Sequence, residues 1–155
     1  MFNTKNDKKQ KRGFACVGLD RPKCASNIGG VLRAAGCYGA DLIVVSGSRY
    51  NKSKVDTQKA YKHIPMLESA DLKSMIPKDC VPVAVDLVDG AENLCDFEHP
   101  ERAFYIFGSE DGTLDDKILS FCQRKVYVPT SHCMNLAATA NVVLYDRMTK
   151  RKEYA

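Results

Sequence analysis

Short apolar runs rich in β-branched residues alternate along this chain with segments whose apolar residues recur at helical spacing. The five runs predicted as strands are residues 14–19, 41–46, 81–87, 103–107 and 125–128. Several are almost continuously apolar, as strands are when both faces of a parallel sheet are covered. The segments predicted as helices are residues 27–38, 114–122 and 135–152. This alternation predicts a single-domain α/β fold with a mostly parallel sheet and helices on both faces.

The length and the charge distribution divide the chain into a basic tail and one domain. Its 155 residues are enough to bury roughly two thirds of the surface of the unfolded chain without disulfides or metal. We expect a basic tail over residues 1–12 and one domain over residues 13–155. The formal charge is +4, and lysines and arginines crowd both ends of the chain. Such clusters suit nucleic acid, but they are also typical of solvated tails.

Cysteine and histidine usage argues against several kinds of site. The seven cysteines include no Cys-x-x-Cys pair and mostly lie in apolar runs, which predicts a reducing compartment. The first residues lack a signal-peptide pattern, and no window approaches the roughly 20 apolar residues of a membrane span. We therefore expect a cytoplasmic protein that does not enter a membrane. His63, His99 and His132 lie far apart without partners at metal-ligand spacing, so we expect no metal.

Three polar turns follow predicted strands and open predicted helices. The first is residues 27–35, the second is residues 108–114, and the third joins residues 126–129 to residues 134–136. Turns of this kind lie at the carboxyl ends of parallel strands, where open α/β sheets bind ligands. We therefore expect the three turns to form one composite site. Thr113 is the predicted N-cap of the helix after the second turn.

The sequence argues against a phosphate-binding loop at this site. Neither Gly-x-Gly-x-x-Gly nor a Gly-Lys-Thr/Ser loop is present, which disfavours cofactors with a pyrophosphate. A neutral or cationic ligand with an adenine moiety could instead use backbone groups at the strand ends and apolar packing. The polar side chains left for the reacting centre would then be Asn27, Arg33, Glu110 and Asn135.

A basic segment over residues 48–65 interleaves lysine and arginine with tyrosine. This pattern is typical of surfaces that bind phosphates and stack on the bases of single-stranded RNA. A charged, solvated helix face explains the pattern equally well. The sequence is consistent with both hypotheses.

The three turns resemble the ordered motifs of the SpoU/TrmH branch of the SPOUT RNA methyltransferases. The matching residues are Asn27, Gly29, Arg33, Ala34 and Ala35; Gly108, Ser109, Glu110, Gly112 and Leu114; and Pro129, Met134, Asn135, Leu136, Leu144, Tyr145 and Asp146. One such motif is weak, whereas three in order are specific. The resemblance implies a deep trefoil knot in the C-terminal third, an exception to the rule against threaded connections. It also implies a homodimer in which the partner chain completes each active site.

The resemblance also implies an activity. Members of this branch transfer a methyl group from S-adenosyl-L-methionine, bound in a bent form in the knot, to a ribose 2′-hydroxyl of RNA. The expected partner is therefore RNA, either tRNA or rRNA. By position, the resemblance assigns cofactor contacts to Val85, Gly108, Val128, Cys133, Met134 and Leu136.

Arg33 matches the residue proposed in this family to activate the hydroxyl. A guanidinium stays protonated in nearly every protein environment. We therefore expect Arg33 to hold the phosphate beside the target ribose and to stabilise the developing alkoxide. Glu110 and Asn27 suit a tether between two loops, although Glu110 could also pair with Arg33 or act as a general base. Asn135 fits both a helix N-cap and an amide of the site.

Several residues depart from the family pattern. Thr130 stands where methionine is usual and Cys133 where serine is usual, and the turn between them is shorter than in most members. Asp111 replaces a small residue and adds negative charge near the expected phosphate. These changes concern the substrate-facing rim more than the cofactor pocket. The competing hypothesis is a SPOUT-like domain that binds RNA or adenosylmethionine without transferring a methyl group.

Overall fold

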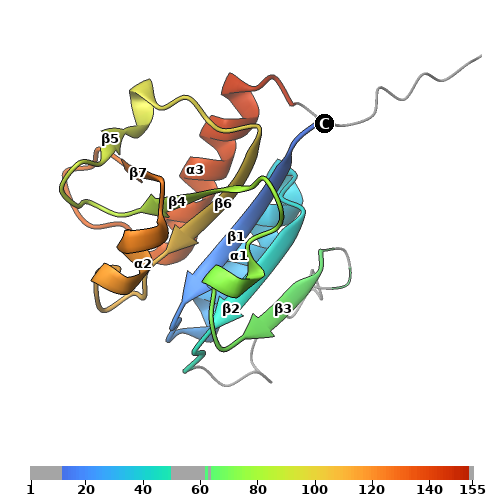
Figure 1. Cartoon of the computed structure of the whole chain (residues 1–155), viewed down its shortest axis with the longest axis vertical. Coiled ribbons are helices and arrows are strands. Elements are labelled where there is room, and N and C mark those ends of the chain that lie inside the picture. Colours follow the sequence, from blue (N-terminus) through green and yellow to red (C-terminus); the bar gives the residue numbers. More distant parts are fainter. Residues whose placement is uncertain (1–11, 50–61, 63, 154–155) are drawn as a thin grey trace, which may run out of the picture.

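The computed structural model describes residues 12–49, 62 and 64–153, which form one sheet flanked by helices (Figure 1). The strands are β1 (Phe14–Asp20), β2 (Leu42–Ser46), β3 (Met66–Ser69), β4 (Val81–Val85), β5 (Glu92–Asn93), β6 (Arg102–Phe107) and β7 (Arg124–Tyr127). The helices are α1 (Ala25–Tyr38), α2 (Asp116–Phe121) and α3 (Leu136–Lys150), with short 3-10 helices at Lys73–Met75 and Leu94–Asp96. The basic tail, apart from Arg12, and most of segment 48–65 lie outside the described residues.

The sheet is parallel, as the apolar runs predict. Its order is β3-β2-β1-β6-β4-β7-β5, and each neighbouring pair runs in the same direction. The five predicted strands correspond to β1, β2, β4, β6 and β7. Because parallel strands end at a common edge, the turns after β1, β4, β6 and β7 lie at the same edge of the sheet.

The sequence pattern does not predict β3 and β5, which lie at the two edges of the sheet. The residues of β3 are partly or fully exposed, and β5 contains only two residues. Neither strand has the continuous apolar run that distinguishes a central strand from a loop. An edge strand pairs on one side only, so packing constrains its sequence less.

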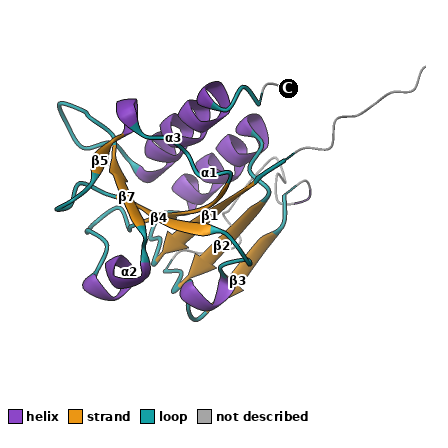
Figure 2. Cartoon of the chain, turned by 45° about the horizontal axis from the view of Figure 1, so that its top comes forward, coloured by secondary structure: helices purple, strands orange, loops and turns teal. Residues whose placement is uncertain are grey.

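Helices cover both faces of the sheet, which confirms the second part of the fold prediction (Figure 2). α1 and α3 lie together on one face, where Leu19, Ile28 and Leu144 belong to one apolar core. α2 lies on the other face, where Phe104 and Ile118 belong to a second core. The strands are therefore buried from both sides, which explains why their residues are almost continuously apolar.

α2 begins at Asp116 and is capped by Asp115, so the prediction of Thr113 as its N-cap is wrong. Asp115 Oδ1 accepts a hydrogen bond from the backbone N–H of Ile118 at 2.9 Å. The backbone N–H of Leu114 donates instead to Asp86 Oδ2 at 2.9 Å. This long-range contact holds Leu114 in the turn, and the helix starts after it.

The cations at the end of α3 bind backbone carbonyls inside the protein. Arg147 is 3% exposed and donates to the carbonyl oxygens of Pro100 at 2.6 Å and Glu101 at 2.8 Å. Lys150 donates to the carbonyl oxygens of Leu94 and Phe97. The sequence allowed the C-terminal cations to be nucleic-acid contacts or a solvated tail. For Arg147 both interpretations are wrong, because its side chain is buried.

His99 is buried between β6 and α3. Its Nδ1 lies 2.7 Å from Tyr105 Oη, and its Nε2 lies 2.6 Å from Asp146 Oδ2. Burial lowers the pKa of His99 from 6.5 to about 4, because an imidazolium would lose its hydration there, and the neighbouring Asp146 offsets this effect only in part. His99 is therefore neutral in the folded protein at neutral pH.

We expect the protein to lose stability as the pH falls below about 6.5. The pKa of His99 is lower in the folded than in the unfolded chain, so the unfolded chain takes up the proton first. The stabilisation is complete above about pH 6.5 and is lost towards about pH 4, at up to about 1.4 kcal/mol per pH unit. Urea unfolding over this pH range measures the effect, with His99→Gln as the comparison. An equally steep decline in His99→Gln would contradict the assignment.

The described residues also bear on metals and membranes. No helix among them has the length and apolar character needed to cross a membrane. They contain no group of three or more histidine, cysteine, aspartate or glutamate side chains that could hold a metal ion.

Candidate active site

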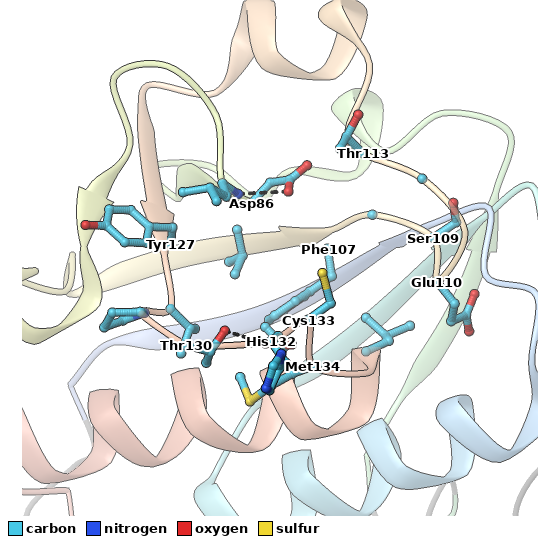
Figure 3. Close-up of a pocket in the computed structure, with 18 of the residues that line it drawn as sticks. Asp86, Phe107, Ser109, Glu110, Thr113, Tyr127, Thr130, His132, Cys133 and Met134 are labelled. Carbon is cyan, nitrogen blue, oxygen red and sulfur yellow. Dashed lines mark hydrogen bonds between the residues drawn. The ribbon is translucent and has the colours of Figure 1, made fainter.

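A pocket of about 1050 Å³ opens at the carboxyl edge of β4, β6 and β7 (Figure 3). Its lining comes from residues 85–87, residues 107–113 except Asp111, residues 127–134, and Leu136 and Thr139 of α3. The second and third predicted turns therefore meet in one pocket, together with the residues that follow β4. Asp86 and Thr113 lie on one side of this pocket, and His132 and Met134 lie on the other.

Each of the six residues that the resemblance assigns to the cofactor lines this pocket. They are Val85, Gly108, Val128, Cys133, Met134 and Leu136. The lining combines apolar side chains with backbone groups at the strand ends. It includes the acids Asp86 and Glu110 but neither lysine nor arginine. Such a lining suits a neutral or cationic nucleoside better than a polyphosphate.

Asp86 joins two walls of the pocket, and the sequence analysis did not identify it. Its carboxylate accepts hydrogen bonds from the backbone N–H groups of Leu87 at 2.8 Å and Leu114 at 2.9 Å. Its own backbone N–H donates to the carbonyl oxygen of Val126 at 3.0 Å. The only signal in the sequence is an acid directly after a buried strand, which many turns share.

Glu110 ties the second turn to the start of α1. Its carboxylate accepts hydrogen bonds from the backbone N–H groups of Lys23 at 2.9 Å and Cys24 at 3.2 Å, and from Asn27 Nδ2 at 3.1 Å. Partial burial raises the pKa of Glu110, but hydrogen bonds from backbone amides and Asn27 outweigh it, so the net pKa lies below the ordinary value. An ionised carboxylate with these donors suits a tether better than a general base.

The four predicted reacting side chains are only partly brought together. Glu110 lines the pocket and binds Asn27, whereas Asn27, Arg33 and Asn135 do not line it. Arg33 is exposed on α1. Asn135 Oδ1 accepts from the backbone N–H of Ala138 at 2.7 Å and so caps α3. The carboxylate of Glu110 is therefore bonded to the start of α1, not to the guanidinium of Arg33.

The third turn is short and closed by its own hydrogen bond. Thr130 Oγ1 donates to the carbonyl oxygen of His132 at 2.6 Å. His132 and Cys133 are exposed, and both line the pocket. The threonine that departs from the family pattern thus stabilises the turn around which the pocket rim is built.

A third carboxylate, Asp111, lies beside the pocket and binds an arginine from the segment after β2. Arg49 donates from two guanidinium nitrogens to Asp111, at 2.8 and 3.2 Å. Hydrogen bonds from the Arg49 guanidinium and from the Ser109 side chain hold the pKa of Asp111 well below its ordinary value. The negative charge that the sequence places near the expected phosphate is therefore paired.

The comparison with protein families agrees with this geometry. A model of the SpoU rRNA methylase family matches residues 15–145, which include the first two motifs and all of the third except Asp146. This chain belongs to the SpoU family. The resemblance stated from the sequence is thereby confirmed, and the pocket described above lies where two motifs of a SpoU protein meet.

Solved structures share the fold of this SpoU protein at low sequence identity. The SpoU methyltransferase AviRb from Streptomyces viridochromogenes matches with a TM-score of 0.80 and 21% identity, over 92% of this chain and 61% of AviRb. A TrmH/SpoU tRNA modifying enzyme from A. aeolicus matches with a TM-score of 0.80 and 18% identity, over 92% of this chain and 78% of its own. A structure that addresses 2-OH methylation of C/U34 on tRNA matches with a TM-score of 0.78 and 19% identity, over 92% of this chain and 94% of its own.

These likenesses establish the fold. AviRb has also been solved in complex with AdoMet. This chain spans about three fifths of the length of AviRb. Comparison with the curated proteins gave no significant match.

Proposed function

We propose that this SpoU protein transfers a methyl group from S-adenosyl-L-methionine to a ribose 2′-hydroxyl of tRNA or rRNA. The observation that carries the proposal is the pocket at the carboxyl edge of β4, β6 and β7, where the second and third family motifs meet. S-adenosyl-L-methionine is the cofactor. Its sulfonium already provides an activated methyl group, so the protein has to position the acceptor and stabilise the charge that develops on it.

The pocket suits this cofactor in charge and in size. A lining without lysine or arginine does not repel the sulfonium, and Asp86 and Glu110 contribute negative charge. Val85, Phe107 and Leu136 provide apolar surface for a nucleoside. The volume of about 1050 Å³ is at the upper end of small-molecule pockets, which are about 300–1,000 Å³. It leaves space for the target nucleotide beside the cofactor.

In this proposal the transfer depends on positioning. The pocket residues hold the methyl donor and exclude water, so that the ribose oxygen can approach in line with the breaking bond. Arg33 binds the phosphate beside the target ribose and stabilises the alkoxide, and the proton leaves through that phosphate. Asn27 and Glu110 hold the start of α1 against the second turn, and Asn135 fixes the start of α3 beside the third.

Arg33 does not line the pocket of its own chain, so we propose that it acts in the pocket of a partner subunit. The exposed face of α1 and α3 supports such a homodimer. Val142 is 38% exposed and Tyr145 53% exposed on α3, and the Tyr145 ring lies edge-on to Tyr38 of α1 with 5.7 Å between centroids. Apolar and aromatic side chains of this kind are enriched at subunit interfaces.

We expect Val142→Glu to convert the dimer into a monomer. A carboxylate in the apolar centre of a two-fold interface is buried twice without a cation to pair with it. Sedimentation velocity at micromolar concentration measures the change, with Leu67→Glu as the control. Leu67 is 43% exposed on the edge strand β3, away from α1 and α3, and its variant should remain dimeric. A dimeric Val142→Glu protein would place the interface elsewhere.

We also propose that the C-terminal third forms the trefoil knot of the family. The strand order supports it, because β7 lies between β4 and β5, two strands that precede it in the chain. The chain from β4 through β5 to β6 thus passes around the position that β7 and α3 later occupy. Such a knot would hold the third turn rigidly beside the cofactor.

A methyl-transfer assay tests the proposed function directly. The purified protein is incubated with S-adenosyl-L-methionine labelled in the methyl group and with unmodified total RNA, and the RNA is then digested to nucleosides. Label in 2′-O-methylnucleosides supports the proposal. Label in methylated bases would overturn the choice of ribose. Cofactor binding by calorimetry without any transfer would instead support a non-catalytic binding domain.

A further inference from the structure

The Asp111 carboxylate and the Arg49 guanidinium form a bidentate pair beside the pocket. The two hydrogen bonds measure 2.8 and 3.2 Å. Asp111 stands between Glu110 and Gly112, which both line the pocket. Asp111 is therefore adjacent in sequence to the pocket wall. It follows Glu110, which binds the start of α1.

Arg49 is held in place independently of Asp111. Its Nε and one terminal nitrogen donate to the carbonyl oxygen of Arg21 at 3.1 and 2.9 Å. Its backbone N–H donates to the carbonyl oxygen of Pro22 at 2.9 Å. These contacts fix the guanidinium over the turn after β1, so it remains there when the carboxylate leaves.

A second cation faces the same carboxylate. Lys23 Nζ lies 3.8 Å from Asp111 Oδ2. Lys23 is also positioned, because its backbone N–H binds Glu110. Asp111 thus lies between the Arg49 guanidinium and the Lys23 ammonium. The backbone of Arg49 is bonded to Pro22, and the backbone of Lys23 is bonded to Glu110 of the pocket wall.

We infer that Arg49 and Lys23 form a subsite for an RNA phosphate, and that Asp111 covers this subsite until RNA displaces it. The inference rests on the proposed function, since it assigns part of the RNA-binding surface of that site. An arginine binds the two free oxygens of a phosphodiester in the same forked geometry as a carboxylate. The carboxylate therefore already occupies the positions that phosphate oxygens would take.

The exposure of the pair makes the exchange feasible. The side chains of Arg49 and Asp111 are 42% and 45% exposed. Solvent and salt screen such a pair, so breaking it costs little. RNA that presents a phosphate here displaces the carboxylate and gains the contacts with Arg49 and Lys23. RNA that does not present one leaves the carboxylate in place and meets its negative charge, so it binds more weakly. The departure of Asp111 from the family pattern thereby acquires a role in substrate selection.

A second pair in the chain provides a matched control. Arg124 also binds a carboxylate through two guanidinium nitrogens. Its Nε and one terminal nitrogen donate to Glu92, with hydrogen bonds of 2.8 to 3.0 Å. The two side chains are 32% and 46% exposed. Arg124 is the first residue of β7 and lies at the opposite end of that strand from the pocket. Glu92→Gln and Asp111→Asn thus remove the same charge from equivalent pairs at different places.

The test measures binding of a fluorescein-labelled RNA stem-loop by anisotropy over a range of salt concentrations. We expect Asp111→Asn to tighten binding about three- to tenfold at low salt and to steepen the slope of log K against log salt by up to about 0.9. Glu92→Gln should change affinity less than about twofold, because its charge lies away from the RNA. In a background that carries both Arg49→Ala and Lys23→Ala, the Asp111→Asn substitution should give no further gain.

Two results would overturn the inference. One is an equal effect of Asp111→Asn and Glu92→Gln on RNA affinity. Such a result would show that affinity responds to the net charge of the protein and not to the place of the charge. The other is a gain from Asp111→Asn that persists when both Arg49 and Lys23 are replaced. Thermal unfolding of each variant confirms that it is folded before binding is measured. Because the readout is binding, a chain that shows this pattern but transfers no methyl group would overturn the proposed function and leave the phosphate subsite in place.

Discussion

Arg33→Ala should lower methyl transfer to RNA by about 100- to 1,000-fold, the range found when one donor to a developing oxyanion is removed. The affinity for S-adenosyl-L-methionine should not change, because Arg33 does not line the cofactor pocket of its own chain. Single-turnover transfer of labelled methyl groups measures the first quantity, and calorimetry measures the second. The separation of the two effects distinguishes a catalytic residue from one that shapes the pocket.

Arg124→Ala is the matched control for this experiment. It also removes a surface arginine, but at the opposite end of β7 from the pocket. We expect its transfer rate to stay within about twofold of the unsubstituted protein, because the screened charge is remote from the reaction. An Arg33→Ala protein with normal transfer and normal cofactor binding would remove Arg33 from the mechanism.

Mixed dimers test whether Arg33 acts across the interface. A Gly108→Trp chain keeps Arg33 but fills its own pocket, since Gly108 lines that pocket. An Arg33→Ala chain keeps the pocket but lacks the guanidinium. If Arg33 serves the partner's pocket, mixing the two inactive proteins should restore transfer in one site per dimer. Restoration would not occur if Arg33 served its own chain.

Arg147→Met should destabilise the fold by about 3–5 kcal/mol, the cost of removing one partner from a buried charged hydrogen-bond network. Methionine fills a similar volume, but it removes the guanidinium donor to the carbonyl oxygens of Pro100 and Glu101 and to the hydroxyl of Tyr105. The Glu101 carbonyl oxygen keeps a hydrogen bond from the backbone N–H of Phe14. Urea unfolding measures the loss. Since Arg147 fastens α3 to the segment before β6, cofactor binding should weaken as α3 loosens.

Arg12→Met is the control for the buried arginine. The Arg12 side chain is 84% exposed and contacts Glu101 at 3.2 Å. Substitutions at such surface positions usually change stability by less than about 0.5 kcal/mol. An Arg147→Met protein as stable as Arg12→Met would show that the buried network contributes nothing to the fold.

Part of the site could be predicted because it follows local rules. Gly108 and Val128 lie where apolar strands end, and parallel strands end at one edge, so the residues after β4, β6 and β7 had to meet. The six cofactor positions were assigned from motif order, and all of them line one pocket. The cap formed by Asn135 on α3 is one of the two roles that the sequence allows, whereas the resemblance favoured the other, an amide of the site, and Asn135 does not line the pocket.

Other parts of the site could not be predicted because their partners are distant in the chain. Asp86 meets Leu114, and Arg49 meets Asp111 62 positions further along. The sequence identifies each of these side chains as charged or apolar but gives no indication of its partner. The cap of α2 was misassigned to Thr113 for the same reason, because the contact of Leu114 with Asp86 sets where the helix can begin.

The sequence by itself determined the parallel sheet, the helices on both faces and the family, because periodicity, strand-end turns and motif order are local properties of the chain. The tertiary structure decided which charged groups are available for function. Arg147 is enclosed because α3 packs over the segment before β6. Arg33 is left outside its own pocket because it lies on the exposed side of α1. The accessibility and the partner of a charge depend on contacts between residues far apart in the chain, and only the packed fold specifies those contacts.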